Sequence, residues 1–79
     1  MYYINYNTGA GNETAESLSE AKRLADEGAA YTQRNITIYD DDGNEVAGRI
    51  WYGCMTDVEL CEDPITFGDF GFYGDWYDL

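Results

Sequence analysis

The sequence predicts an α+β fold in which a three- to four-stranded antiparallel sheet carries one helix on one face. Three observations support this prediction. Residues 2–6 alternate with period two, residues 18–27 carry apolar side chains at helical spacing, and an Asp-Gly turn separates strand-like segments at residues 35–39 and 45–52. The resulting β-α-β-β order, in a chain of 79 residues, indicates a single domain spanning residues 1–79.

The helix has a start signal and a stop signal. Ser17 is expected to be the N-cap, with Glu20 as the second half of a capping box, and Gly28 is expected to follow the last helical turn as the C′ residue. The stripe that faces the sheet is expected to consist of Leu18, Ala21, Leu24 and Ala25.

Each strand is expected to present one face to this helix. The expected inward residues are Tyr2, Ile4 and Tyr6 of the first strand, Ile36 and Ile38 of the second, and Val46, Gly48, Ile50 and Tyr52 of the third. The opposite face then holds Tyr3, Asn5, Thr37, Tyr39, Ala47, Arg49 and Trp51. That face is rich in aromatic rings and has no helix to cover it.

Acidic residues followed by a glycine are also typical of calcium-binding loops, so a calcium site is an alternative interpretation of the three aspartates before Gly43. If Gly43 is the sixth loop position, the first and twelfth positions are Ile38 and Arg49, where an EF-hand requires acidic ligands. We therefore predict a hairpin turn, with no metal site and no cofactor. Weak calcium binding stays open, either by Asp40, Asp41 and Asp42 or by Glu59, Glu62 and Asp63.

The C-terminal segment, residues 65–79, contains six aromatic rings, three glycines and three aspartates. Disordered tails are poor in aromatic residues, because they do not bury enough apolar surface to offset the loss of chain entropy. We therefore predict a short strand at residues 65–67 and an irregular, packed segment at residues 70–76. These rings are expected to cover the aromatic face of the sheet.

The charge is strongly negative and unevenly distributed. Sixteen acidic residues oppose four basic ones and no histidine, which gives a net charge of −12, and residues 40–79 hold eleven acids and one base. This balance disfavours direct binding to nucleic acid or to an anionic membrane and favours a basic protein surface as partner. The N-terminus shows no signal peptide, so the expected location is the cytoplasm, where Cys54 and Cys61 would be reduced.

Catalysis is not expected. The chain has no histidine to activate either cysteine, and its one lysine, Lys22, lies on the outer face of the helix. A binding role remains, in which aromatic anchors are rimmed by carboxylates. The candidate partner-binding residues are Asp69, Tyr73, Asp75, Trp76, Tyr77 and Asp78 in the C-terminal segment, and Asp40, Asp41 and Asp42 in the hairpin.

In size, net charge, tyrosine content and lack of catalytic side chains, the chain resembles the small acidic proteins of phages and mobile elements. These include anti-restriction and anti-CRISPR inhibitors, several of which imitate DNA. The resemblance lies in the composition of the whole chain and carries over no individual residue. It implies a bacterial protein that occupies the basic nucleic-acid-binding cleft of a host defence or DNA-handling protein.

A second function class stays open beside the inhibitor. A small structural or adaptor module could act through the aromatic sheet face, or form a homodimer there. Salt separates the two classes, because an acidic mimic binds less tightly as the salt concentration rises, whereas an apolar docking face is nearly insensitive to salt.

Overall fold

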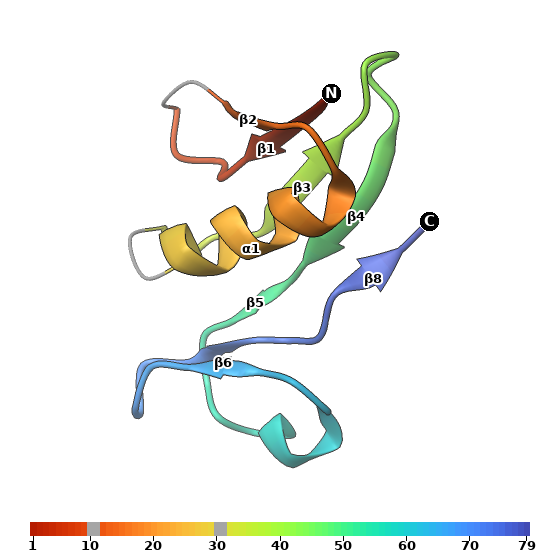
Figure 1. Ribbon diagram of the computed structural model, residues 1–79. Coiled ribbons are helices and arrows are strands. Elements are labelled where there is room, and N and C mark those ends of the chain that lie inside the picture. Colours follow the sequence, from red (N-terminus) through yellow and green to blue (C-terminus); the bar gives the residue numbers. More distant parts are fainter. Residues whose placement is uncertain (10–11, 30–31) are drawn as a thin grey trace.

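The computed structural model describes residues 1–9, 12–29 and 32–79 and has an α+β fold with one α-helix and two antiparallel sheets (Figure 1). The elements in order are β1 (Tyr2–Asn5), β2 (Glu13–Ala15), α1 (Leu18–Gly28), β3 (Ile36–Tyr39), β4 (Glu45–Arg49), β5 (Trp51–Tyr52), the 3-10 helix η2 (Val58–Leu60), β6 (Ile65–Thr66), β7 (Phe72–Tyr73) and β8 (Tyr77–Asp78). The larger sheet has the strand order β2-β1-β3-β4-β8 and the smaller one β5-β7-β6. Helix α1 lies across one face of the larger sheet, as predicted (Figure 1).

The larger sheet gains a strand at each edge that the β-α-β-β prediction lacks. Strand β2 pairs with β1 at one edge, where Tyr2 lies opposite Ala15, and β8 pairs with β4 at the other. Ala15 is buried and joins the core below α1. Strands of two or three residues are too short to show a periodic pattern, so pairing partners far along the chain decide where they form.

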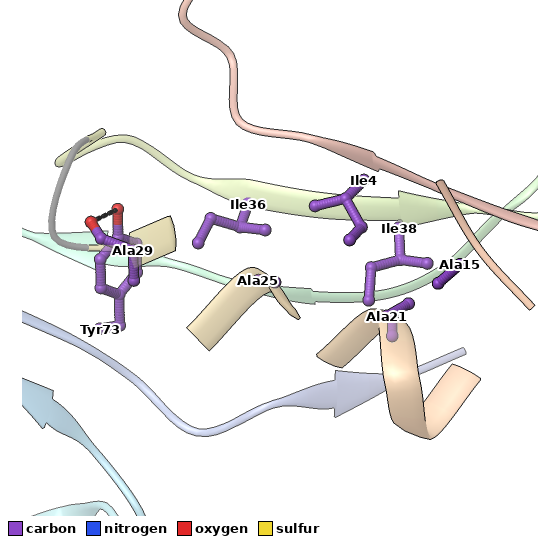
Figure 2. Packing of buried hydrophobic residues seen from close by; sticks show 9 residues of the cluster. Ile4, Ala15, Ala21, Ala25, Ala29, Ile36, Ile38 and Tyr73 are labelled. Atoms are coloured by element: carbon purple, nitrogen blue, oxygen red, sulfur yellow. Dashed lines mark hydrogen bonds between the residues drawn. The ribbon is translucent and has the colours of Figure 1, made fainter. Parts of the chain in front are cut away.

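Helix α1 begins as predicted. The Ser17 side chain accepts a hydrogen bond from the Glu20 backbone N–H at 3.1 Å, which satisfies one of the free donors of the first turn. Ala21 and Ala25 are fully buried against the sheet. Figure 2 shows these alanines facing Ile4, Ile36 and Ile38 of β1 and β3, which together form the core. Among the described residues, no helix is both long enough and apolar enough to cross a membrane.

The end of α1 differs from the prediction. Gly28 is itself the last helical residue. Ala29 caps the helix in a right-handed conformation, and its N–H donates to the backbone carbonyl oxygen of Asp26. Gly28 instead leaves room for the Tyr6 side chain, because a Cβ atom at position 28 would lie 2.8 Å from the Tyr6 hydroxyl.

A β-bulge divides strand β4. Ile38 lies opposite Ala47, but the next residue, Tyr39, lies opposite Glu45, so that Val46 is the extra residue of β4. An extra residue interrupts the alternation of side chains, and every position beyond it then points to the face opposite the one that simple counting gives.

The bulge overturns the predicted faces of β4 from Ala47 onward, whereas Val46 packs against the core as predicted. Ala47 and Arg49 point toward α1, where both are buried, and Gly48 faces the other side. Gly48 does allow a close approach, but by the Tyr77 ring of β8 rather than by the helix. A Cβ atom at position 48 would lie 2.5 Å from the Tyr77 hydroxyl.

The strand predicted over residues 45–52 ends at Arg49, and β5 belongs to the smaller sheet. Ile50 and Tyr52, expected to face the helix, are exposed instead. On one face of the smaller sheet, Trp51 lies opposite Tyr73, which also pairs with Ile65. This face packs on the main core.

The C-terminal segment is packed into the fold, as predicted. Phe72 is 2% exposed and Tyr73 is 0% exposed. The centroids of Trp51 and Tyr73 lie 5.0 Å apart, and those of Trp51 and Phe67 lie 5.7 Å apart. The segment does not lie over one sheet face, however. It supplies β6 and β7 to the smaller sheet and then β8 to the larger one.

Two glycines provide a matched test of this packing. Gly71 has a φ of +142°, and a Cβ atom there would collide with the Tyr52 carbonyl oxygen, whereas Gly43 has a φ of +82° with open space around it. We expect Gly71→Ala to lower the free energy of unfolding by about 2–3 kcal/mol and Gly43→Ala by about 1 kcal/mol. Urea unfolding measures both, and equal losses would contradict the tight contact at Gly71.

Candidate functional site

The face of the larger sheet opposite α1 gathers tyrosines on neighbouring strands. Tyr3 of β1 lies opposite Tyr39 of β3, and Tyr77 of β8 lies opposite Gly48 of β4. All three tyrosines are half-buried, and no helix among the described residues covers them. We call this surface, together with Glu45 and the hairpin residues Asp40, Asp41 and Asp42, the tyrosine face.

Hydrogen bonds hold carboxylates beside two of these rings. The Tyr77 hydroxyl donates to Glu45 at 3.0 Å, and the Tyr3 hydroxyl donates to Asp41 at 3.4 Å. The other oxygen of Asp41 lies 2.9 Å from the N-terminal ammonium of Met1. Burial, and then the Glu45 carboxylate, raise the pKa of Tyr77, so this hydroxyl remains protonated and continues to donate at neutral pH.

The hairpin turn is confirmed between β3 and β4. One oxygen of Asp40 accepts the backbone N–H groups of Asp42 at 2.9 Å and Asn44 at 3.0 Å, and Gly43 supplies the left-handed conformation. Asp41 and Asp42 are exposed at the tip. Among the described residues, no group of three acidic or sulfur side chains is arranged to hold a metal ion.

The C-terminal aspartates have three different environments. Asp75 accepts the backbone N–H groups of Glu62 at 2.8 Å and Asp63 at 2.6 Å, and so fixes the loop that follows η2. Asp78 forms an ion pair of 2.7 Å with Lys22 of α1. Asp69 is exposed in the turn between β6 and β7. These carboxylates therefore do not form one continuous surface.

Two of the three candidate aromatic residues are structural. Tyr73 is fully buried, and its hydroxyl donates to the Ala29 carbonyl at 3.3 Å (Figure 2). The same hydroxyl accepts the Arg34 N–H at 3.2 Å. Trp76 is half-buried, and its indole N–H donates to Asp26 of α1 at 3.1 Å. Of these three rings, only Tyr77 lies on the tyrosine face.

Arg49 is the main residue that sequence reasoning placed wrongly. Its side chain is only 1% exposed, and Nη1 donates to the carbonyl oxygens of Asp63 and Gly74, each at 3.1 Å. Its Nε lies 3.2 Å from the Asp26 carboxylate, and its guanidinium lies 5.2 Å from the centre of the Trp76 ring. The one available signal was that Arg49 is the only base among residues 40–79.

The basic side chains are largely neutralised within the chain. Lys22 pairs with Asp78, Arg23 pairs with Glu27 at 3.2 Å, and Arg49 pairs with Asp26. Together with the pairs at Asp41 and Asp63, ion pairs between described residues engage only five of the sixteen acids. Most of the carboxylates therefore have no cationic partner within the described part of the chain.

The hydrogen bonds of the Asp75 carboxylate lead to a prediction about how the stability of the fold depends on pH. Its hydrogen bonds to the backbone N–H groups of Glu62 and Asp63 lower the pKa of Asp75 in the folded state. A lowered pKa stabilises the folded state above about pH 4, and this contribution is lost as the pH falls through the folded pKa. We expect the melting temperature of Asp75→Asn to lie below that of the wild type at pH 6 and to converge with it by about pH 2. A constant difference between pH 6 and 2 would contradict this role.

Two pockets lie outside the tyrosine face. One, of about 260 Å³, is lined by Tyr6, Thr8, Glu13, Gly28 and Thr32, and the other, of about 240 Å³, by Tyr52, Thr56, Asp57, Leu60, Cys61 and Phe72. Both are smaller than the roughly 300–1,000 Å³ that small-molecule sites occupy.

The geometry thus offers a carboxylate-rimmed tyrosine face and two small pockets as candidate sites. No family model matches the chain, and no curated protein or solved structure is significantly similar to it.

Proposed function

We propose that the chain is a non-catalytic acidic binding protein whose tyrosine face docks on a basic protein surface. The observation that carries the proposal is the pairing of rings with fixed carboxylates, at Tyr77 with Glu45 and at Tyr3 with Asp41. Arginine stacks on aromatic rings and binds carboxylates through its planar fork, so one arginine side chain can use both groups. Holding the carboxylates in advance reduces the entropy that binding costs.

The net charge supports the same class of partner. At −12, the chain attracts a cationic surface over a long range, and most of its carboxylates have no internal cation to screen them. The basic cleft of a nucleic-acid-binding protein recognises backbone charge before sequence. The proposed partner is therefore a host defence or DNA-handling protein in the cytoplasm, where the unpaired thiols of Cys54 and Cys61 are stable.

The titratable groups support a role without catalysis. Burial, and then Glu13, raise the pKa of Tyr6 to about 12, so this hydroxyl is protonated at neutral pH and is a poor base. The Asp26 carboxylate is already paired with Arg49 and accepts the indole N–H of Trp76, so it is engaged in holding the fold.

A second candidate is a structural or adaptor module that uses the same tyrosine face, either in a homodimer or against an apolar partner. The observation in its favour is that three half-buried tyrosines share a sheet face that no helix covers within residues 1–9, 12–29 and 32–79. Such binding would respond little to salt.

A capture experiment with two charge-matched variants tests the proposal. Asp42→Asn/Glu45→Gln removes two charges from the tyrosine face, and Glu16→Gln/Glu20→Gln removes two charges at the start of α1, on the other side of the sheet. The immobilised proteins are incubated with bacterial lysate and eluted with a salt gradient or with double-stranded DNA. We expect the wild type to retain a DNA-binding protein that DNA displaces, and the tyrosine-face variant to bind it about tenfold more weakly.

The control variant is expected to elute close to the wild type. Equal weakening by both variants would show that only net charge matters and would contradict a role for the tyrosine face. Retention that neither salt nor DNA reverses would favour the adaptor module instead.

A further inference from the structure

The smaller sheet carries a second surface that the tyrosine face does not include. Tyr52 of β5 lies opposite Phe72 of β7, and their rings stack with centroids 5.1 Å apart and an interplanar angle of 21°. The opposite face of this sheet, with Trp51 and Tyr73, packs on the main core. Segment 56–61, which contains η2, faces the stacked rings and closes the pocket of about 240 Å³, which we call the η2 pocket.

The walls of the η2 pocket are held in place without a ligand. Phe72 is 2% exposed at its base. The 3-10 helix is closed by two backbone hydrogen bonds. The Leu60 N–H donates to the Asp57 carbonyl oxygen at 3.0 Å, and the Cys61 N–H donates to the Val58 carbonyl oxygen at 3.1 Å. The Asp75 carboxylate fixes the backbone that follows, as described above. A preformed pocket loses little entropy when a side chain enters it.

The lining combines apolar side chains with unusual exposure. Leu60 is 77% exposed at the rim and Tyr52 is 44% exposed, whereas both belong to residue types that usually lose water on folding. A volume of about 240 Å³ is too small for a typical cofactor but accommodates one large side chain of a partner.

The negative charge around the η2 pocket indicates which kind of partner segment fits it. Asp57 is part of the lining, Glu59 lies within η2, and Glu62 and Asp63 follow it, while no lysine or arginine occurs after Arg49. A second copy of the chain would bring two such acidic loops together and is therefore disfavoured. A segment rich in lysine and arginine has the complementary charge.

We infer that the η2 pocket binds one bulky apolar side chain of a basic segment, with flanking lysine or arginine side chains paired to the acidic loop. The inference rests on the proposed function only in the basic character of the partner. The residues involved are different, so the two sites can be tested separately.

The test is a titration of ¹⁵N-labelled protein with a seven-residue peptide of alternating lysine and arginine that has a central tryptophan. A matched peptide has alanine at the centre. We expect the tryptophan peptide to shift the amide signals of Tyr52, Leu60 and Phe72 and to bind about tenfold more tightly than the alanine peptide. Both affinities should fall as the salt concentration rises.

Leu60→Ser and Phe70→Ser form a matched pair of variants, because both residues are 77% exposed and, of the two, only Leu60 lines the pocket. We expect Leu60→Ser to abolish the preference for tryptophan and Phe70→Ser to keep it, and their amide spectra report whether each variant is folded. Equal affinity of the wild type for the two peptides, or an equal effect of the two variants, would overturn the inference.

Two further outcomes separate the sites. If the peptide shifts only amides of the tyrosine face, such as those of Tyr39 and Glu45, the η2 pocket is not a docking site and the proposed function stands. If it shifts only amides of the pocket, the inference stands and the tyrosine face loses its role. Shifts at Leu60 that depend on protein concentration without peptide would identify a second copy as the occupant and overturn the inference.

Discussion

Replacing Arg49 with methionine is expected to lower the free energy of unfolding by about 3–4 kcal/mol. The methionine would fill similar space, but the carbonyl oxygens of Asp63 and Gly74 would lose their donor, and the Asp26 carboxylate would lose its ion pair. A small domain has a total stability of roughly 5 kcal/mol, so the variant would be partly unfolded at room temperature. Urea unfolding followed by tryptophan fluorescence measures the effect.

Arg23→Met is the matched control for this prediction. Arg23 forms an ion pair with Glu27 on the outer surface of α1, where both side chains are at least 60% exposed, and such pairs contribute about 0.5 kcal/mol or less. Arg49→Lys should also destabilise, because an ammonium group does not reproduce the planar geometry with which the guanidinium reaches two carbonyls and a carboxylate. If Arg49→Met were as mild as Arg23→Met, the buried network would not be holding the two sheets together.

The network around Arg49 also explains why the charge of this chain is arranged as it is. Burial raises the pKa of the Asp26 carboxyl, and the Asp63 charge adds to the increase, while Arg49 opposes it. One buried cation thus moderates the repulsion between carboxylates that arrive from α1 and from the loop after η2. The close approach of Asp26 and Asp63 therefore depends on a basic residue that does not itself reach the solvent.

Local chemistry was sufficient to predict several elements. The start of α1 follows from Ser17, whose side chain accepts the hydrogen bond expected of an N-cap. The hairpin follows from the Asp-Gly pair at Asp42 and Gly43, and the alternation of β1 follows from its apolar positions. Each of these signals lies within a few residues of the structure that it predicts, so long-range packing had little room to override it.

The errors arise where contacts far along the chain decide the structure. The bulge at Val46 reverses the faces of β4 after that residue. No local pattern in the segment predicts it, because the extra residue appears only in the pairing with β3. One displaced residue was enough to place Arg49 on the wrong face. Strands β2, β7 and β8 have two or three residues each, which is too short for a periodic pattern. The pairing of β7 with β5 and of β8 with β4 also joins residues 20 or more positions apart, which no local signal could reveal.

The candidate site was predicted in part for the same reason. Composition identified the residue types correctly, because aromatic rings and carboxylates do lie together, at Tyr77 with Glu45 and at Tyr3 with Asp41. The assignment of each ring to surface or core required the strand pairing. Tyr73 and Tyr77 are both tyrosines of the C-terminal segment, yet one is fully buried and the other is half-buried on the open face.

Truncation of Tyr73 to alanine is expected to lower the free energy of unfolding by about 3–5 kcal/mol. The ring is 0% exposed, contacts Trp51 of β5 and Phe67, which follows β6, and reaches Ala29 at the end of α1 through its hydroxyl. Its removal would leave a cavity at the point where the two sheets and the helix meet, which adds to the loss of buried apolar area. Thermal and urea unfolding measure the loss.

Two milder variants separate the contributions of the ring and the hydroxyl. Tyr73→Phe keeps the ring but leaves the Arg34 N–H without its acceptor, and the Ala29 carbonyl keeps only the Thr32 N–H as donor, so we expect a loss of about 1–2 kcal/mol. Phe70→Ala, at a residue 77% exposed in the same segment, should change the stability by no more than about 0.5 kcal/mol. Similar effects of Tyr73→Ala and Phe70→Ala would mean that the C-terminal segment folds onto the sheets without stabilising them. The expected order instead makes this segment the part of the chain that joins the smaller sheet to the core beneath α1.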